Sequence, residues 1–186
     1  MKLKIELILK CQFVLFLLIM QSCTGQNTAT KEDKHKFDFA IYKDTIEKFE
    51  INIPKKWINQ TDKDSRMSLI IISDEKIKNE TQTNFNLQIL NLELTDLNES
   101  YFYYLQNLEK AKEFKILESG EKIIHKRKYK WLVEYHKNHF TDEDMINYNL
   151  FTNKDGKVLV LTMVSTKNQF EKIRPVFEDI MKSLKF

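Results

Sequence analysis

The first 23 residues constrain this chain most, because they decide which part of it folds and in which compartment. A lysine-bearing start is followed by the apolar run 13–20 and then by Ser22 and Cys23. This order of charge, apolar core and small residue is typical of a bacterial secretory signal. The apolar run is less than half of the roughly 20 residues that a membrane-spanning helix needs. A cysteine at the cut predicts a lipoprotein signal, so we expect cleavage between Ser22 and Cys23 and acylation of the Cys23 thiol.

An ordinary secretory signal stays open as the alternative. Met20 and Gln21 stand where an aliphatic and a small residue are commoner in lipoprotein signals. In that case Cys23 would be an unmodified thiol or would be lost with the signal. With a lipid on Cys23, the protein would be anchored to a membrane of the cell envelope, because two or more acyl chains give stable anchoring.

Removal of residues 1–22 changes both the thiol content and the charge. Cys11 leaves with the signal, so the mature chain has no second cysteine for a disulfide with Cys23. The 164 remaining residues are enough for one domain with its own core. The removed segment carries three lysines and one glutamate, so the formal charge falls from +3 to +1. A nearly neutral protein binds polyanions poorly, and we therefore expect no nucleic-acid partner.

The polar segment 24–36 offers nothing to bury and is predicted to be a flexible tether. A coil of that length spans about 20 Å on average. Residues 1–22 are thus expected to be the signal peptide, 23–36 the lipidated tether and 37–186 a single domain.

Residues 37–164 show mostly strand patterns, in which apolar side chains alternate and predict one buried face. The predicted strands are 37–42, 49–53, 67–72, 84–94 with a bulge at Leu90, 114–118 paired with 122–125 about Gly120, 129–136, and 146–152 paired with 157–164 about the turn 153–156.

Two helices are predicted. The first begins at Asp96, which with Glu99 matches a capping box. Its apolar stripe comprises Leu97, Tyr101, Tyr104, Leu105 and Leu108, which leaves Tyr103 facing water as the candidate interaction residue.

The second helix follows a capping pattern at 166–169. Its apolar face comprises Phe170, Ile173, Phe177, Ile180, Met181 and Leu184. Pro175 lies inside it, and a proline there predicts a kink or a restart.

Residues with catalytic or metal-binding chemistry are few. His136 and His139 would share a helix face, but the surrounding alternation predicts a strand that sends them to opposite sides. The acidic turn 142–144 and the basic run 125–130 are predicted to be solvated. Trp57 and Trp131 are expected to close the edge of the core. We therefore expect no catalytic set, no metal site and no cofactor.

Two stretches resemble the PsbP-like family, named for an extrinsic subunit of photosystem II and including many bacterial lipoproteins. The segment 49–57 is similar to the family's opening strand with its proline and tryptophan, although Lys56 stands where many members carry glycine. The segment 156–186 is similar to its closing strand and helix. The resemblance implies an α+β fold in which an antiparallel sheet is flanked by helices on both sides. No residue here identifies photosystem binding.

The expected function is non-catalytic binding of a membrane-associated protein by an envelope lipoprotein. The alternative is a small-ligand or lipid carrier with a cavity between sheet and helices, which a core filled by Phe85, Leu105, Val160 and Phe177 would argue against. An enzyme would require His125, His136 or His139 to meet carboxylates in a cleft.

Overall fold

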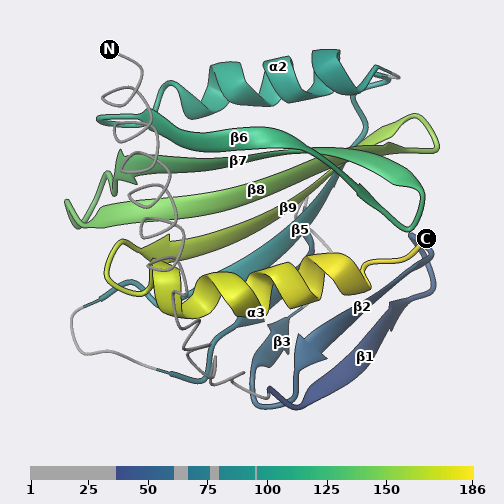
Figure 1. Ribbon diagram of the computed structural model, residues 1–186, viewed down its shortest axis with the longest axis horizontal. Helices are drawn as coiled ribbons and strands as arrows, with labels where there is room; N and C mark the ends of the chain where they lie inside the picture. Colours follow the sequence, from purple (N-terminus) through teal and green to yellow (C-terminus); the bar gives the residue numbers. More distant parts are fainter. Residues whose placement is uncertain (1–36, 61–66, 76–79, 95) are drawn as a thin grey trace, which may run out of the picture. The chain divides into compact units, whose positions relative to one another are not determined.

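The computed structural model describes residues 37–60, 67–75, 80–94 and 96–186. The predicted signal peptide 1–22, the predicted cleavage residues Ser22 and Cys23, and the predicted tether up to residue 36 lie outside the described residues. Within the described ranges the elements are β1 (Phe39–Asp44), β2 (Phe49–Pro54), β3 (Ile58–Gln60), β4 (Met67–Ile72), β5 (Asn84–Leu90), α2 (Leu97–Leu108), β6 (Lys115–Ile124), β7 (Arg127–Lys137), β8 (Asp144–Lys154), β9 (Lys157–Thr166) and α3 (Phe170–Ser183) (Figure 1).

Seven strands form one antiparallel sheet in the order β3-β4-β5-β9-β8-β7-β6, and β1 pairs with β2 in a separate hairpin. Alternate residues of the large sheet belong to two apolar clusters. One contains Leu150 and Leu161 and packs against α3, and the other contains Phe151 and Val160 and packs against α2. Neighbouring residues in a strand point to opposite faces, so α2 and α3 cover opposite faces. The predicted α+β sandwich is confirmed.

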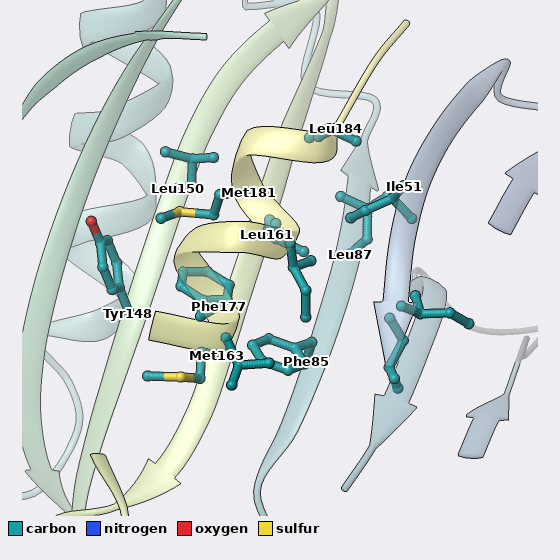
Figure 2. Packing of buried hydrophobic residues seen from close by; sticks show 14 of the residues in the cluster. Ile51, Phe85, Leu87, Tyr148, Leu150, Leu161, Met163, Phe177, Met181 and Leu184 are labelled. Atoms are coloured by element: carbon teal, nitrogen blue, oxygen red, sulfur yellow. The ribbon is translucent and has the colours of Figure 1, made fainter. Parts of the chain in front are cut away.

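The α3 face of the sheet is filled by aromatic side chains. Phe177 stacks on Phe85 with ring centroids 5.2 Å apart, and Phe85 stacks in turn on Trp57 at 5.0 Å. Figure 2 shows Phe177 and Met181 of α3 lying against side chains of the sheet, with Leu184 directly after the end of the helix. All six residues predicted for the apolar face of α3 are buried. Each such side chain contributes about 1.5 to 3 kcal/mol on burial.

Trp57 closes the edge of this core, as predicted. It is 5% exposed, and its backbone N–H donates to Pro54 O at 3.0 Å, which closes a tight turn between β2 and β3. Trp131 is half-buried and lies against Tyr148, with ring centroids 5.6 Å apart.

Of the kink or restart predicted at Pro175, the structure excludes the restart, and the predicted capping by Thr166 was wrong. The helix does not restart at Pro175 but continues as one element to Ser183 (Figure 1). Thr166 does not cap it, because β9 extends through Thr166, where it pairs with Met145. The N-cap is Gln169, which makes no side-chain capping bond.

Gly120 was wrongly predicted to be a turn. β6 runs unbroken past it, and the hairpin closes at His125 and Lys126, whose φ angles are +48° and +67°. Gly120 lies opposite Trp131, and a Cβ on Gly120 would lie 3.1 Å from the indole. The glycine therefore makes room for Trp131 on the sheet. The turn predicted at 153–156 is confirmed, with Gly156 at φ +76°.

The bulge predicted at Leu90 was also wrong. The register between β5 and β9 continues without a shift from Asn84 opposite Val164 to Leu90 opposite Val158. The strand ends at Leu90, so the change of apolar phase after it belongs to the loop that leads to α2. In the described part of the chain, no helix is long and apolar enough to span a bilayer.

Candidate binding face

Helix α2 begins where its sequence predicts. The Asp96 carboxylate accepts hydrogen bonds from the N–H groups of Asn98 at 2.7 Å and Glu99 at 3.0 Å. These two backbone bonds hold the pKa of Asp96 below its ordinary value. The aspartate therefore satisfies free N–H groups at the helix N-terminus, as the capping-box pattern predicts.

The predicted apolar stripe of α2 packs on the sheet, but loosely. Tyr101 and Tyr104 meet the Phe151 ring edge-on, with centroids 5.3 and 5.0 Å apart. The stripe residues remain partly exposed, and the one fully buried residue among the described positions of α2 is Ser100. Its hydroxyl group lies 3.0 Å from Asn153 Oδ1 of β8.

Tyr103 points away from the sheet, as predicted. Its exposed fraction is 45%, and that of the neighbouring Phe102 is 60%. The two rings give the outer side of α2 an aromatic surface. Phe102 was not singled out from the sequence, although it too lies outside the apolar stripe.

A polar cluster lies on the α2 side of the sheet, and sequence reasoning missed it. Glu134 of β7 is directly opposite Asn147 of β8, while Asn149, two residues further along β8, is opposite Thr162 of β9. Their side chains share one face because paired residues in an antiparallel sheet point the same way. Glu134 and Asn149 are both 0% exposed. We call Glu134, Asn147, Asn149 and Thr162 the polar cluster.

Hydrogen bonds satisfy part of this cluster. The Nδ1–H of His136 donates to Glu134 Oε2 at 2.9 Å, and the Thr162 hydroxyl donates to Asn149 Oδ1 at 2.8 Å. Three buried atoms nevertheless have no protein partner, namely Glu134 Oε1, Asn147 Oδ1 and Asn149 Nδ2. Buried polar atoms are normally hydrogen-bonded, and each one left unpaired costs about 1 to 3 kcal/mol.

Tyr104 of α2 reaches toward this cluster. Burial raises the pKa of its phenol above the ordinary value, a hydrogen bond with Thr162 lowers it, and the nearby charge of Glu134 raises it. The edge of α2 thus approaches the unpaired atoms. Glu134 could have been suspected from the sequence, because it has the same strand phase as the apolar Leu132 and is therefore directed toward the helix.

Half-buried amides extend the cluster across the sheet. Asn86 of β5 is opposite Thr162 of β9. Asn84 of β5 is opposite Val164 of β9, and Val164 in turn pairs with Asn147 of β8. Both asparagines are half-buried, as is Gln88 on the same face of β5. Amide side chains therefore continue from the edge of α2 to an accessible part of the sheet.

Three of the chain's four histidines were named as candidates, and in the described structure these three do not assemble into a catalytic set. His125 lies in the β6–β7 turn, 2.8 Å from Lys182 O, and His139 lies beside the exposed Phe140 in the β7–β8 turn. His136 alone meets a buried carboxylate, that of Glu134. No group of three or more metal-ligating His, Cys, Asp or Glu side chains occurs within the described ranges.

The acidic turn is ion-paired with neighbouring lysines at the surface, as expected for a solvated turn. Asp142 lies 2.6 Å from Lys112 Nζ, and Asp144 lies 2.8 Å from Lys137 Nζ. The hydrogen bond from each lysine lowers the pKa of its partner carboxyl.

Within the described ranges, three of the four side chains named for the carrier hypothesis are fully packed in the core. Phe85, Val160 and Phe177 are 0% exposed and Leu105 is partly buried. A pocket beside the start of α3, lined by Ser73, Thr83 and Ile173 among others, holds about 20 Å³. That is room for about one water molecule, so an acyl chain does not fit there.

Comparisons with known proteins identify the fold. No curated protein matches the chain. Among solved structures, cyanobacterial PsbP from Synechocystis is 13% identical, with a TM-score of 0.55 over 79% of this chain and 91% of that protein. LpqN of Mycobacterium tuberculosis, described as involved in cell envelope biogenesis, is 9% identical, with a TM-score of 0.56 over 81% and 91%. The Ran-binding protein Mog1p of Saccharomyces cerevisiae is also 9% identical, with a TM-score of 0.56 over 80% and 95%.

At these identities the three structures share a fold with this chain. The family is shown separately, because the PsbP family model matches residues 37–186. The chain is therefore a member of the PsbP family.

Proposed function

We propose that this protein is a lipid-anchored accessory protein of the cell envelope that binds a membrane-associated protein without catalysing a reaction. The observation that carries this proposal is the exposed aromatic pair Phe102 and Tyr103 on the outer side of α2. Aromatic side chains are enriched where proteins bind each other. Supporting it, LpqN, described as an envelope-biogenesis protein, and the Ran-binding Mog1p have the same fold.

The anchor is proposed from the N-terminal sequence. Cleavage after Ser22 would expose Cys23 as an acylated first residue, and residues 24–36 would tether the domain 37–186. A lipid on Cys23 should appear in bacterial cells as incorporation of labelled palmitate. Cys23→Ser should abolish the label and release the protein from the membrane fraction. An unlabelled wild-type protein would reject the anchor.

The binding surface can be tested in intact cells with a photo-crosslinking amino acid placed at position 102 or 103. A specific partner on α2 should give one discrete adduct at both positions. Phe140 is the matched control, because it is an aromatic residue that is 93% exposed in the turn between β7 and β8, outside α2. An equal adduct at position 140, or no adduct at 102 and 103, would reject α2 as the interface.

A further inference from the structure

We propose that strand β6 is a dimerisation surface, where it pairs in antiparallel fashion with β6 of a second copy of this chain. This goes beyond the interface proposed on α2, because it concerns an edge of the sheet and a partner identical to the chain itself. It depends neither on the lipid anchor nor on the partner proposed for α2.

β6 is the longer of the two free edges of the large sheet. It is the last strand in the sheet order, and among the described strands it pairs with β7 alone (Figure 1). The opposite edge strand, β3, has three residues, whereas β6 has ten. A long edge with exposed apolar side chains tends to pair with another strand. The exposed apolar residues of β6 are Ile116, Leu117 and Ile123.

The turn at the end of β6 determines which backbone groups face away from β7. His125 and Lys126 both have positive φ, as in a two-residue type I′ turn. The pair next to such a turn, Ile124 and Arg127, is hydrogen-bonded, and the ladder continues from it without a register shift back to Glu118. Every second residue then points its N–H and C=O groups outward. The outward-facing residues are Ser119, Glu121 and Ile123.

The charges of β6 are complementary to each other when two copies pair about Gly120. In that register Glu118 lies opposite Lys122 of the partner subunit, and the contact occurs twice because a two-fold axis relates the copies. A pairing centred on Glu121 would instead place two like carboxylates opposite each other, which is destabilising. At the axis, glycine adds no side chain between the two Trp131 indoles, each of which lies against its own Gly120.

The same register also matches the backbone and the apolar side chains. It places Ser119 opposite Glu121 of the partner subunit, and both residues have outward-facing N–H and C=O groups, so they can exchange two hydrogen bonds. Next along the strands, Leu117 lies opposite Ile123 of the partner subunit. Apolar cross-strand pairs stabilise a sheet. One register therefore pairs exposed apolar residues, opposite charges and free backbone groups at once.

Lys122 is the half-buried charge that this pairing would neutralise. Its side chain folds back over the rings of Trp131 and Tyr148, at 5.1 and 5.2 Å, and its ammonium group donates to the Tyr148 hydroxyl at 2.7 Å. Burial lowers its pKa below the ordinary value. No carboxylate in the described part of the chain forms an ion pair with it. A turn of the flexible lysine side chain toward the edge would bring its ammonium group to Glu118 of the partner subunit.

The test measures the mass of the chain isolated from bacterial cells, by sedimentation in reducing buffer with excess detergent, up to roughly 1 mM. The wild type should dimerise. Lys122→Glu sets two carboxylates opposite each other and Glu118→Lys sets two amines opposite each other, so each should weaken the dimer at least about tenfold. An equimolar mixture of the two variants should recover the dimer, because every contact then joins a carboxylate to an amine. The matched control is Glu50→Lys on β2, since the Glu50 side chain is ion-paired and 42% exposed, against 43% for Glu118.

A second pair of variants tests the backbone pairing. Ser119→Pro removes an N–H group that faces away from β7, so it should weaken the dimer while the fold is kept. Ser119→Ala keeps that N–H group and should leave the dimer almost unchanged. Equal dimerisation of both variants would show that the outward backbone groups do not pair.

Three further results would overturn the dimer. A wild-type chain that stays monomeric at every concentration would leave the edge to a strand of another protein. A dimer that survives both charge reversals, or that Glu50→Lys weakens as much as Glu118→Lys does, would not be held by β6. A mixture of Lys122→Glu and Glu118→Lys that stays monomeric, although both variants melt like the wild type, would reject the register about Gly120.

Discussion

The two helices that cover the faces of the sheet are buried against it to very different extents. Beneath α3, six helix residues are fully buried and aromatic rings stack down to Trp57. Beneath α2, the described helix buries only Ser100, and three polar atoms nearby have no partner. Natural folds keep such unsatisfied groups mainly where function requires them. The α3 face therefore provides most of the stability, and the α2 face is the one that we propose for binding.

The largest effect on stability that this comparison predicts is the loss of the Phe177 side chain. Phe177→Ala should destabilise the fold by about 3 to 5 kcal/mol, because it leaves a cavity among stacked rings. Tyr101→Ala is the matched aromatic truncation under α2 and should cost less than half as much, since Tyr101 is partly exposed. Urea denaturation followed by tryptophan fluorescence measures both. Equal losses would contradict the difference between the two faces.

The second largest predicted effect is a difference in amide hydrogen exchange between the two helices. Local opening is easier where few apolar contacts are lost, so we expect amides in α2 to exchange at least about tenfold faster than those in the centre of α3, a difference of about 1.4 kcal/mol. Mass spectrometry of the full chain after proteolysis gives both rates. Protection of α2 equal to that of α3 would show that the unpaired atoms do not weaken its attachment.

The unpaired carboxylate should also be replaceable without loss of stability. In Glu134→Met with His136→Leu, both partners of the hydrogen bond become apolar, so neither is left buried alone. We expect the fold to be stabilised by up to about 1 kcal/mol and α2 to exchange more slowly. Glu134→Ala alone is the control, since it should lower stability by leaving a gap beside α2. A double variant less stable than Glu134→Ala would contradict the functional interpretation of the cluster.

The sequence predicted the α3 face better than the α2 face, for a physical reason. The spacing of Phe170, Ile173 and Phe177 is set by the helix alone, so periodicity is enough to locate that apolar face. Gly120 and Glu134 depend on residues of a neighbouring strand. The need for a glycine arises only when Trp131 pairs opposite it, and the unpaired oxygen of Glu134 arises only when β8 supplies asparagines beside it. Such partners are set by strand register, which a single strand's alternation does not reveal.

The smallest predicted effect is a pH dependence that belongs to the α3 side. Arg174 of α3 binds both oxygens of Glu118 on β6, at 2.8 and 2.7 Å, and this hydrogen bonding lowers the pKa of Glu118 below its ordinary value. A carboxyl whose pKa is lower in the folded state stabilises the fold above its unfolded pKa. That stabilisation is lost as the pH falls through the folded value.

Because the Glu118 side chain is 43% exposed, water and salt screen the pair, and it should contribute less than about 1 kcal/mol. Glu118→Gln should therefore lower the free energy of unfolding slightly at pH 7 and not at all at a pH below the folded pKa. Glu121→Gln removes another ion-paired carboxylate of β6, one that contacts Lys128 rather than α3. Hydrogen exchange at pH 7 distinguishes the two variants, since only Glu118→Gln should quicken exchange in α3. Faster exchange in α2 instead would mean that the helices are coupled through the sheet, and the two faces would then have to be treated as one cooperative unit.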